Sequence, residues 1–234
     1  LHQQLEAAIK PGDRIVYLGN YLGWGTAVRQ TIDELLAFRR LFLARPDARI
    51  GDIVYLRGAQ EEMWQKLLQL QFAPNPTEVL SWMLEQGLRG TLSAYAGSED
   101  DGFAAAADGP VAIARWTNRL RSAMHALPGH DALMSSLRRA AFSDDQAMLF
   151  VHAGLDPTVP LDDQGDVLWW GGGFGKIKAA YDPFRLVVRG FDRTHAGVQT
   201  THFTATIDAG CGFGGPLLGA CFDRGGRIVD LLEG

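Results

Sequence analysis

Residues 147–157 read AMLFVHAGLDP, an apolar run that ends at a histidine and a glycine. Five apolar residues in succession, 147–151, predict a strand that is covered on both faces of a sheet. His152 follows at the point where that strand ends. Because ligands of α/β proteins bind at the carboxyl ends of strands, the residues that follow each strand are the first candidates for a functional site.

Six further runs have strand character. Three continuous apolar runs lie at 14–19 (RIVYLG), 52–57 (DIVYLR) and 184–190 (FRLVVRG). Three more, at 204–210, 216–223 and 226–233, are separated by glycine-rich turns and predict an antiparallel meander.

Helical periodicity fills most of the remaining chain. Apolar spacing predicts helices over 1–10, 27–44, 61–70, 112–126 and 131–141, and one that starts with Thr77 as its cap. The small, acidic stretch 98–108 predicts a mobile loop. Strand–helix units followed by a strand-rich end predict an α/β fold, a β-sandwich of two sheets with flanking helices, in a single domain over residues 1–234.

Composition narrows the partners and the compartment. A net charge of −5, with scattered basic residues, gives no reason to expect nucleic acid or an anionic membrane as partner. No apolar run approaches the ~20 residues needed to span a bilayer, and the start of the chain does not read as a signal peptide. Cys211 and Cys221 are too few for a disulfide framework and predict buried thiols in a reducing cytoplasm.

Several motifs occur in an order that resembles a known family. They are GDRIVYLG at 12–19, Arg57-Gly58, FVHAGLDP at 150–157, VVRG at 187–190, and IDAG at 207–210 with a glycine pair after it. The set resembles the metallophosphoesterase (calcineurin-like) superfamily, in the bacterial serine/threonine protein phosphatase type. The resemblance covers essentially the whole chain. It implies a four-layer fold and hydrolysis of phosphoric esters by two metal ions.

The resemblance also assigns metal-ligand positions, and most of them are changed. Asn20 stands where the family has the aspartate that bridges both metals, and a neutral amide is a poor bridge between two dications. Ala59 stands at the asparagine ligand and Phe191 at the last histidine ligand. His152 is the only family ligand retained.

The positions that the resemblance assigns to catalysis and phosphate binding are changed too. Gly23 and Trp24 stand at the aspartate and the phosphate-binding arginine, and Gln60 stands at the catalytic histidine. Gln60 cannot shuttle a proton near neutral pH. Only Glu61 keeps the acidic character of its motif. We therefore expect no catalytic residue, no phosphate-binding residue and no metal ligand set.

The opening Asp-x-His motif of the family is not seen, and we expect it to lie upstream of residue 1. Restoring it would still leave the second metal without its bridge and most of its ligands.

These positions predict a catalytically inactive phosphatase-fold protein that acts by binding or scaffolding, with a protein partner and no cofactor. The alternative is an active metal-dependent phosphoesterase with a rebuilt site that holds one divalent metal (Mn, Fe or Zn), with His152 and with His195 or His202 as replacement ligands. A third interpretation is a small-molecule or nucleotide sensor whose cleft is lined by Trp and Phe.

Overall fold

A five-stranded sheet in the order β3-β4-β5-β7-β6 forms the centre of the first of two compact units. The computed structural model describes residues 1–234, and this unit consists of residues 1–19, 38–58 and 137–234. The sheet contains β3 (Ala140–Phe142), β4 (Met148–Val151), β5 (Leu186–Arg189), β6 (Gln199–Thr200) and β7 (Thr204–Thr206).

The three central strands of this sheet are parallel. Leu149 pairs with Val187 in β4 and β5, and Val188 pairs with Ala205 in β5 and β7. The edge strands β3 and β6 are antiparallel to their neighbours. Since β4, β5 and β7 run the same way, the residues that follow them meet at one edge of the sheet.

Both faces of this sheet are covered at its centre, which is why β4 and most of β5 are apolar. One face carries Val188 and Ile207 and packs against Leu218 and Phe222 of the hairpin formed by β8 (Leu218–Phe222) and β9 (Ile228–Glu233). The other face is covered by the 3₁₀ turn η5 (Phe174–Lys176) and by α9 (Val167–Trp170), whose Trp169 is buried against the sheet. The arrangement is a sandwich of two sheets with a helix outside.

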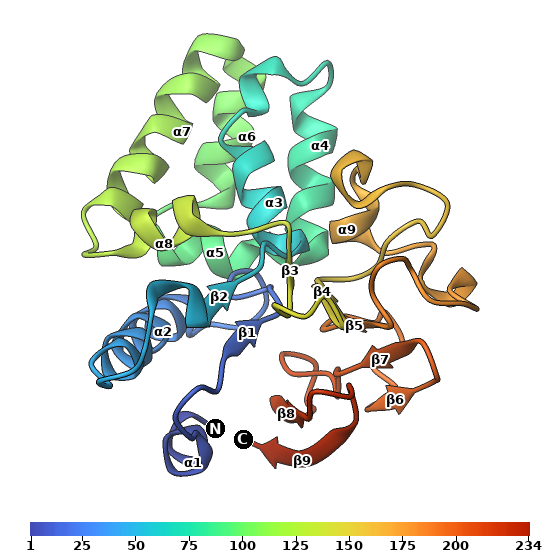
Figure 1. Cartoon of the computed structure of the whole chain (residues 1–234). Helices are drawn as coiled ribbons and strands as arrows, with labels where there is room; N and C mark the ends of the chain where they lie inside the picture. The colour runs from blue at the N-terminus through green and yellow to red at the C-terminus, as the bar shows by residue number, and fades with distance from the viewer. The chain divides into compact units, whose positions relative to one another are not determined.

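A further parallel pair completes the strands of the first unit. β1 (Ile15–Tyr17) pairs with β2 (Ile53–Tyr55), and α2 (Val28–Leu43) connects them in the chain, as parallel strands require. Helix α1 (His2–Ala8) lies against the other end of the chain, where the Gln4 side chain donates a hydrogen bond to the Glu233 carbonyl at 3.0 Å. Figure 1 shows the two ends side by side.

The second unit, residues 20–37 and 59–136, is helical. Its helices gather as a bundle in Figure 1. They are the first part of α2, α3 (Ala59–Leu67), α4 (Pro76–Met83), α5 (Arg89–Ala94), α6 (Glu99–Asp108), α7 (Pro110–His125) and α8 (His130–Ser136). A kinked turn, η3 (Leu84–Leu88), joins α4 to α5, and the kink lies at Gly87, which has a non-helical φ of 107°.

Helical spacing explains the core of this bundle. Leu80, Leu84, Leu88 and Leu92 recur every fourth residue and are all buried. His130 is fully buried, with Tyr95 Oη 2.9 Å from Nδ1 and Asp33 Oδ1 3.1 Å from Nε2. Both ring nitrogens of this buried histidine therefore have a partner within the bundle.

The structure confirms the seven predicted strand segments and corrects their pairing. β8 and β9 form an antiparallel hairpin, but β7 pairs with β5 and β6 instead of joining a meander. The short edge strands β3 and β6 carry no apolar alternation and were not expected. β3 begins within the stretch 131–141 that periodicity assigned to a helix, and helix α8 ends at Ser136.

Three local predictions are wrong for identifiable reasons. Residues 98–108 are not a loop, because Ser98 caps helix α6 and three acidic residues occupy its first turn. Helix α4 begins at Pro76 with Asn75 as its cap instead of Thr77, since proline suits the first turn. Cys211 and Cys221 are free and exposed instead of buried.

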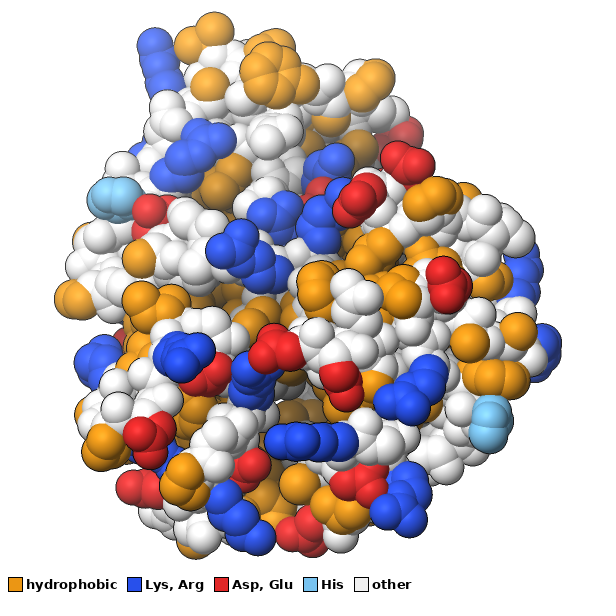
Figure 2. All heavy atoms as spheres, in the orientation of Figure 1, with side chains coloured by type: hydrophobic (Ala, Val, Ile, Leu, Met, Phe, Trp, Pro, Cys, Tyr) orange, Lys and Arg blue, Asp and Glu red, His pale blue; other side chains and the backbone are white.

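The surface agrees with the modest net charge. On the face that Figure 2 shows, Lys and Arg side chains lie interspersed with Asp and Glu side chains. None of the helices combines the length and the hydropathy that crossing a bilayer requires.

Candidate functional site

The predicted site residues fall into two groups, one in each unit. His152 and Phe191 follow β4 and β5 in the first unit, at the edge where the parallel strands end. The second unit contains Asn20, Gly23, Trp24, Ala59, Gln60 and Glu61. The contacts that position each group lie within its own unit.

His152 is held as a neutral imidazole with a fixed tautomer. Its Nδ1 lies 2.7 Å from the Leu18 carbonyl oxygen, which can only accept, so the proton sits on Nδ1. Its Nε2 is buried and has no hydrogen-bond partner. Burial lowers the pKa of His152 to about 4. The ring is therefore uncharged at neutral pH, with a lone pair on a buried nitrogen.

Phe191 packs directly on this imidazole. The two rings are stacked with centroids 5.4 Å apart and planes inclined by 11°. The backbone fixes this arrangement, since the N–H groups of Gly190 and Phe191 both donate to the His152 carbonyl oxygen, at 3.0 and 2.9 Å. Where the resemblance assigns a second imidazole, the structure has a phenyl ring that offers no donor atom.

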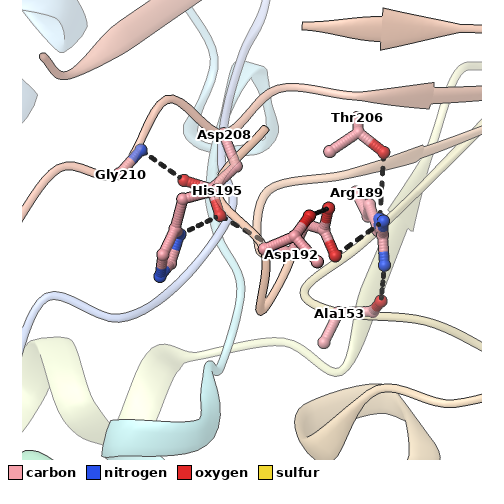
Figure 3. A network of polar contacts seen from close by, with 8 residues as sticks. Ala153, Arg189, Asp192, His195, Thr206, Asp208 and Gly210 are labelled. Carbon is pink, nitrogen blue, oxygen red and sulfur yellow. Dashed lines mark hydrogen bonds and ion pairs between the residues drawn. The ribbon is translucent and has the colours of Figure 1, made fainter. Parts of the chain in front are cut away.

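An Asp–His pair lies next to Phe191 (Figure 3). His195 Nδ1 is 2.9 Å from Asp208 Oδ2, and the same carboxylate accepts the backbone N–H groups of Asp192 and Gly210. The His195 ring also stacks on Phe213, with centroids 4.3 Å apart. His195 has a positive φ of 48°, a strained backbone for a residue other than glycine. The imidazole is thus fixed by a hydrogen bond and a ring contact.

Arg189 is the centre of the second part of the network in Figure 3. Its Nε donates to Thr206 Oγ1 at 2.9 Å, its Nη2 lies 3.1 Å from Asp192 Oδ1, and its guanidinium lies over the Phe174 ring. Burial lowers the pKa of Arg189. Burial raises the pKa of Asp192, but the Thr194 hydroxyl and the Arg189 charge outweigh it, and the net pKa is lowered. The pair therefore carries a fixed positive charge and its counter-charge at the edge of the sheet.

In the second unit, Glu61 organises the loop that follows β1. Its buried carboxylate accepts three consecutive backbone N–H groups, those of Asn20 at 2.9 Å, Tyr21 at 2.7 Å and Leu22 at 2.9 Å. Hydrogen bonds to an ionised acceptor are among the stronger ones in proteins. The acidic residue of this motif therefore has a structural function here.

The side-chain amides of Gln60 and Asn20 form hydrogen bonds with backbone groups of the protein. The Asn20 amide oxygen accepts the Gln60 backbone N–H at 3.1 Å, and the Gln60 side-chain amide donates to the Gln86 carbonyl at 2.7 Å. Gln60 Oε1 is buried without a hydrogen-bond partner. A Cβ at Gly23 would collide with the Gln60 side chain, so Gly23 is needed for this close approach.

Trp24 opens onto a pocket. Trp24 is 44 % exposed, and a Cβ on Gly87 would lie 2.5 Å from its Cε2 atom, so the indole packs on the turn Leu84–Leu88. A pocket of about 640 Å³, lined entirely by residues of the second unit, lies at this point. Among its lining residues are Trp24, Glu85, Gly87 and Arg89.

The donor atoms present do not fit a two-metal centre. Such a centre needs carboxylate and imidazole ligands from several strand ends. Ala59 and Phe191 offer none, and the Asn20 oxygen already accepts a hydrogen bond. Within neither unit do three His, Cys, Asp or Glu side chains gather in a metal-binding arrangement. His152 and His195 each donate from Nδ1 to an oxygen acceptor and have no hydrogen-bond partner on Nε2, as single metal-ligating histidines do.

Sequence reasoning missed the Asp208–His195 pair and the function of Arg189. The sequence indicated His195 only as a replacement metal ligand and Asp208 only as part of the IDAG motif at 207–210. The available signal was their place after β5 and β7, two neighbouring parallel strands. The pairing of those strands, which involves residues far apart in the chain, is what brings them together. His202, the other replacement ligand considered, is exposed and lies beside Phe203.

Comparisons with known proteins place the fold. No family model matches the chain, and no curated protein matches it. The chain has a mixed α/β fold with a β-sandwich, which confirms the predicted fold class. Among solved structures it matches the crystal structure of a proposed diadenosine tetraphosphatase, with a TM-score of 0.58 and 17 % sequence identity, covering 100 % of this chain and 86 % of that chain. At this identity the likeness establishes the fold alone, and the serine/threonine phosphatase type stays a prediction.

Proposed function

We propose that this chain is a phosphatase-fold protein that does not hydrolyse phosphoesters and acts by binding, with a protein as its partner. The observation that carries the proposal is that the side chains at the family's metal-ligand positions contact other residues of the protein. The Asn20 oxygen accepts the Gln60 N–H, and the Phe191 ring covers the His152 imidazole. Side chains committed to such contacts are not available to two metal ions and a phosphate.

One observation supports the alternative, an active phosphoesterase that holds a single divalent metal. The Nδ1–H of His152 is bound to a backbone carbonyl and its Nε2 is uncommitted, as in histidines that ligate metals. Such an ion would be Mn, Fe or Zn and would supply Lewis-acid activation of water. His152 would hold it, with His195 as the replacement ligand, since the Nδ1 of His195 is held by Asp208.

Metal content and hydrolysis together test the proposal. The protein is purified from cells grown with added manganese, iron and zinc, and metal is counted by elemental mass spectrometry. We expect near-zero metal per chain. We also expect hydrolysis of p-nitrophenyl phosphate and diadenosine tetraphosphate no faster in the wild type than in His152→Asn. The second substrate is chosen because the structural neighbour is described as acting on it.

One equivalent of metal, with activity that His152→Asn abolishes and the surface variant His202→Asn retains, would establish the single-metal phosphoesterase instead.

A further inference from the structure

The pocket beside Trp24 has the composition of a ligand site. Its volume of about 640 Å³ lies in the range of small-molecule sites. It is formed by the loop 23–26, the kinked turn Leu84–Leu88 and the start of α5.

Close backbone packing builds the floor of this pocket. Gly23 and Gly25 have positive φ angles, and a Cβ on Gly90 would collide with the carbonyl oxygens of both. The Gly23 N–H donates to Thr91 Oγ1 at 2.7 Å. The loop that carries Trp24 is thus fixed to α5 from both sides, and the indole is held in one place.

The charges that line the pocket favour a cation. Three charged side chains line it, and of these Arg89 is paired with Glu99. The carboxylate of Glu85 is exposed and takes part in no ion pair. An indole face next to an uncompensated carboxylate is the combination that attracts organic cations, through cation–π and direct charge attraction.

We propose that this pocket binds a small flat organic cation, which stacks on Trp24 and places its charge near Glu85. The inference rests on the proposed binding function and names a ligand class for it. A phosphate is disfavoured here, because the only cationic side chain of the pocket is already paired and the remaining carboxylate would repel it.

Isothermal titration calorimetry of the whole protein tests this with three probes. Proflavine is a flat aromatic cation, 1-pyrenesulfonate is a flat aromatic anion, and inorganic phosphate has no aromatic surface. We expect saturable one-site binding of proflavine and at least about tenfold weaker binding of the other two probes.

Two pairs of variants locate the site. Trp24→Ala should weaken proflavine binding about tenfold, whereas Trp82→Ala, which removes an equally exposed indole outside the pocket, should leave it unchanged. Glu85→Gln should weaken proflavine binding several-fold and reduce the ratio of proflavine affinity to pyrenesulfonate affinity. Glu78→Gln on α4 should change neither the affinity nor the ratio.

The proposal is overturned if wild-type protein binds no proflavine, if it binds pyrenesulfonate or phosphate more tightly, or if Trp24→Ala and Glu85→Gln both bind proflavine as the wild type does. Because the readout is binding, these outcomes are distinct from those of the hydrolysis assay. Phosphatase activity would refute the inactive-protein proposal and leave the proflavine result standing.

Discussion

At the scale of single residues, the candidate site is composed of side chains whose polar atoms are mostly bonded to the protein. Glu61 accepts hydrogen bonds from three backbone N–H groups, and the Asn20 side-chain oxygen accepts one. Arg189 forms an ion pair with Asp192. Buried polar groups need such partners to offset their desolvation. His152 and Gln60 are the exceptions, each with one buried atom that has no partner.

His152 should make the stability of the fold depend on pH. Its pKa is about 4 in the folded chain and near 6.5 in an unfolded one. Between these values the unfolded state binds more protons, so the free energy of unfolding falls as the pH falls from about 6.5 to about 4, by about 3 kcal/mol in all. Above pH 6.5 the contribution is fully present.

The variant His152→Asn isolates this effect, because its amide can still donate to the Leu18 carbonyl but does not titrate. Urea unfolding at pH 7, 5.5 and 4.5 should show wild type losing stability faster than the variant as the pH falls. His202→Asn, at an exposed histidine, should follow the wild-type profile. Parallel profiles for wild type and His152→Asn would show that His152 does not titrate in this window.

At the scale of elements, helix α6 shows how a local signal can be misread. Ser98 Oγ accepts the Asp101 N–H at 3.1 Å, which caps the helix. Ser98→Ala should lower the free energy of unfolding by about 1 kcal/mol. Urea unfolding measures this, with Ser122→Ala in the last turn of α7 as the control that removes an exposed serine that caps no helix. An equal effect of the two changes would mean that the cap contributes nothing.

The strength of the local sequence pattern decides which elements can be predicted. Long apolar runs predicted β4 and β5 correctly, because burial on both faces leaves a strong pattern. Edge strands β3 and β6 have two or three residues each and little burial, so no pattern marks them. In 98–108 the capping serine and the alanines are helix signals, but small acidic residues also resemble a loop.

The sequence predicted which ligand positions of the candidate site are changed, because each change is visible at a single residue. Changed ligand positions such as Ala59 and Phe191 could be recognised from motif order. The contacts that the residues at those positions make could not be predicted from the sequence. The stacking of Phe191 on His152 depends on the parallel pairing of β4 with β5, and the Asp208–His195 pair on that of β5 with β7. Strand pairing is non-local, and a one-residue change of register would turn each side chain to the other face.

At the scale of the whole molecule, both ends of the chain lie in the sheet unit, where they contact each other. Gln4 bonds to the Glu233 carbonyl at 3.0 Å, and a Cβ on Gly234 would lie 2.8 Å from the Leu1 nitrogen. A short Gly-Ser linker can therefore join residue 234 to residue 1 without moving either end. The sheet unit contains three separate segments of the chain and the helical unit two, so chain order is not what holds either unit together.

A circular permutant tests that last statement. With the original ends joined and new ends placed between Gly109 and Pro110, in the turn from α6 to α7, no strand and no buried apolar side chain is interrupted. We expect native circular dichroism and a free energy of unfolding within about 1 kcal/mol of wild type. The matched permutant, with the same linker but new ends between Val187 and Val188, cuts the buried central strand β5 and should not fold. If the first permutant also fails to fold, the statement is wrong: the fold then requires either free original ends or the unbroken connection from α6 to α7.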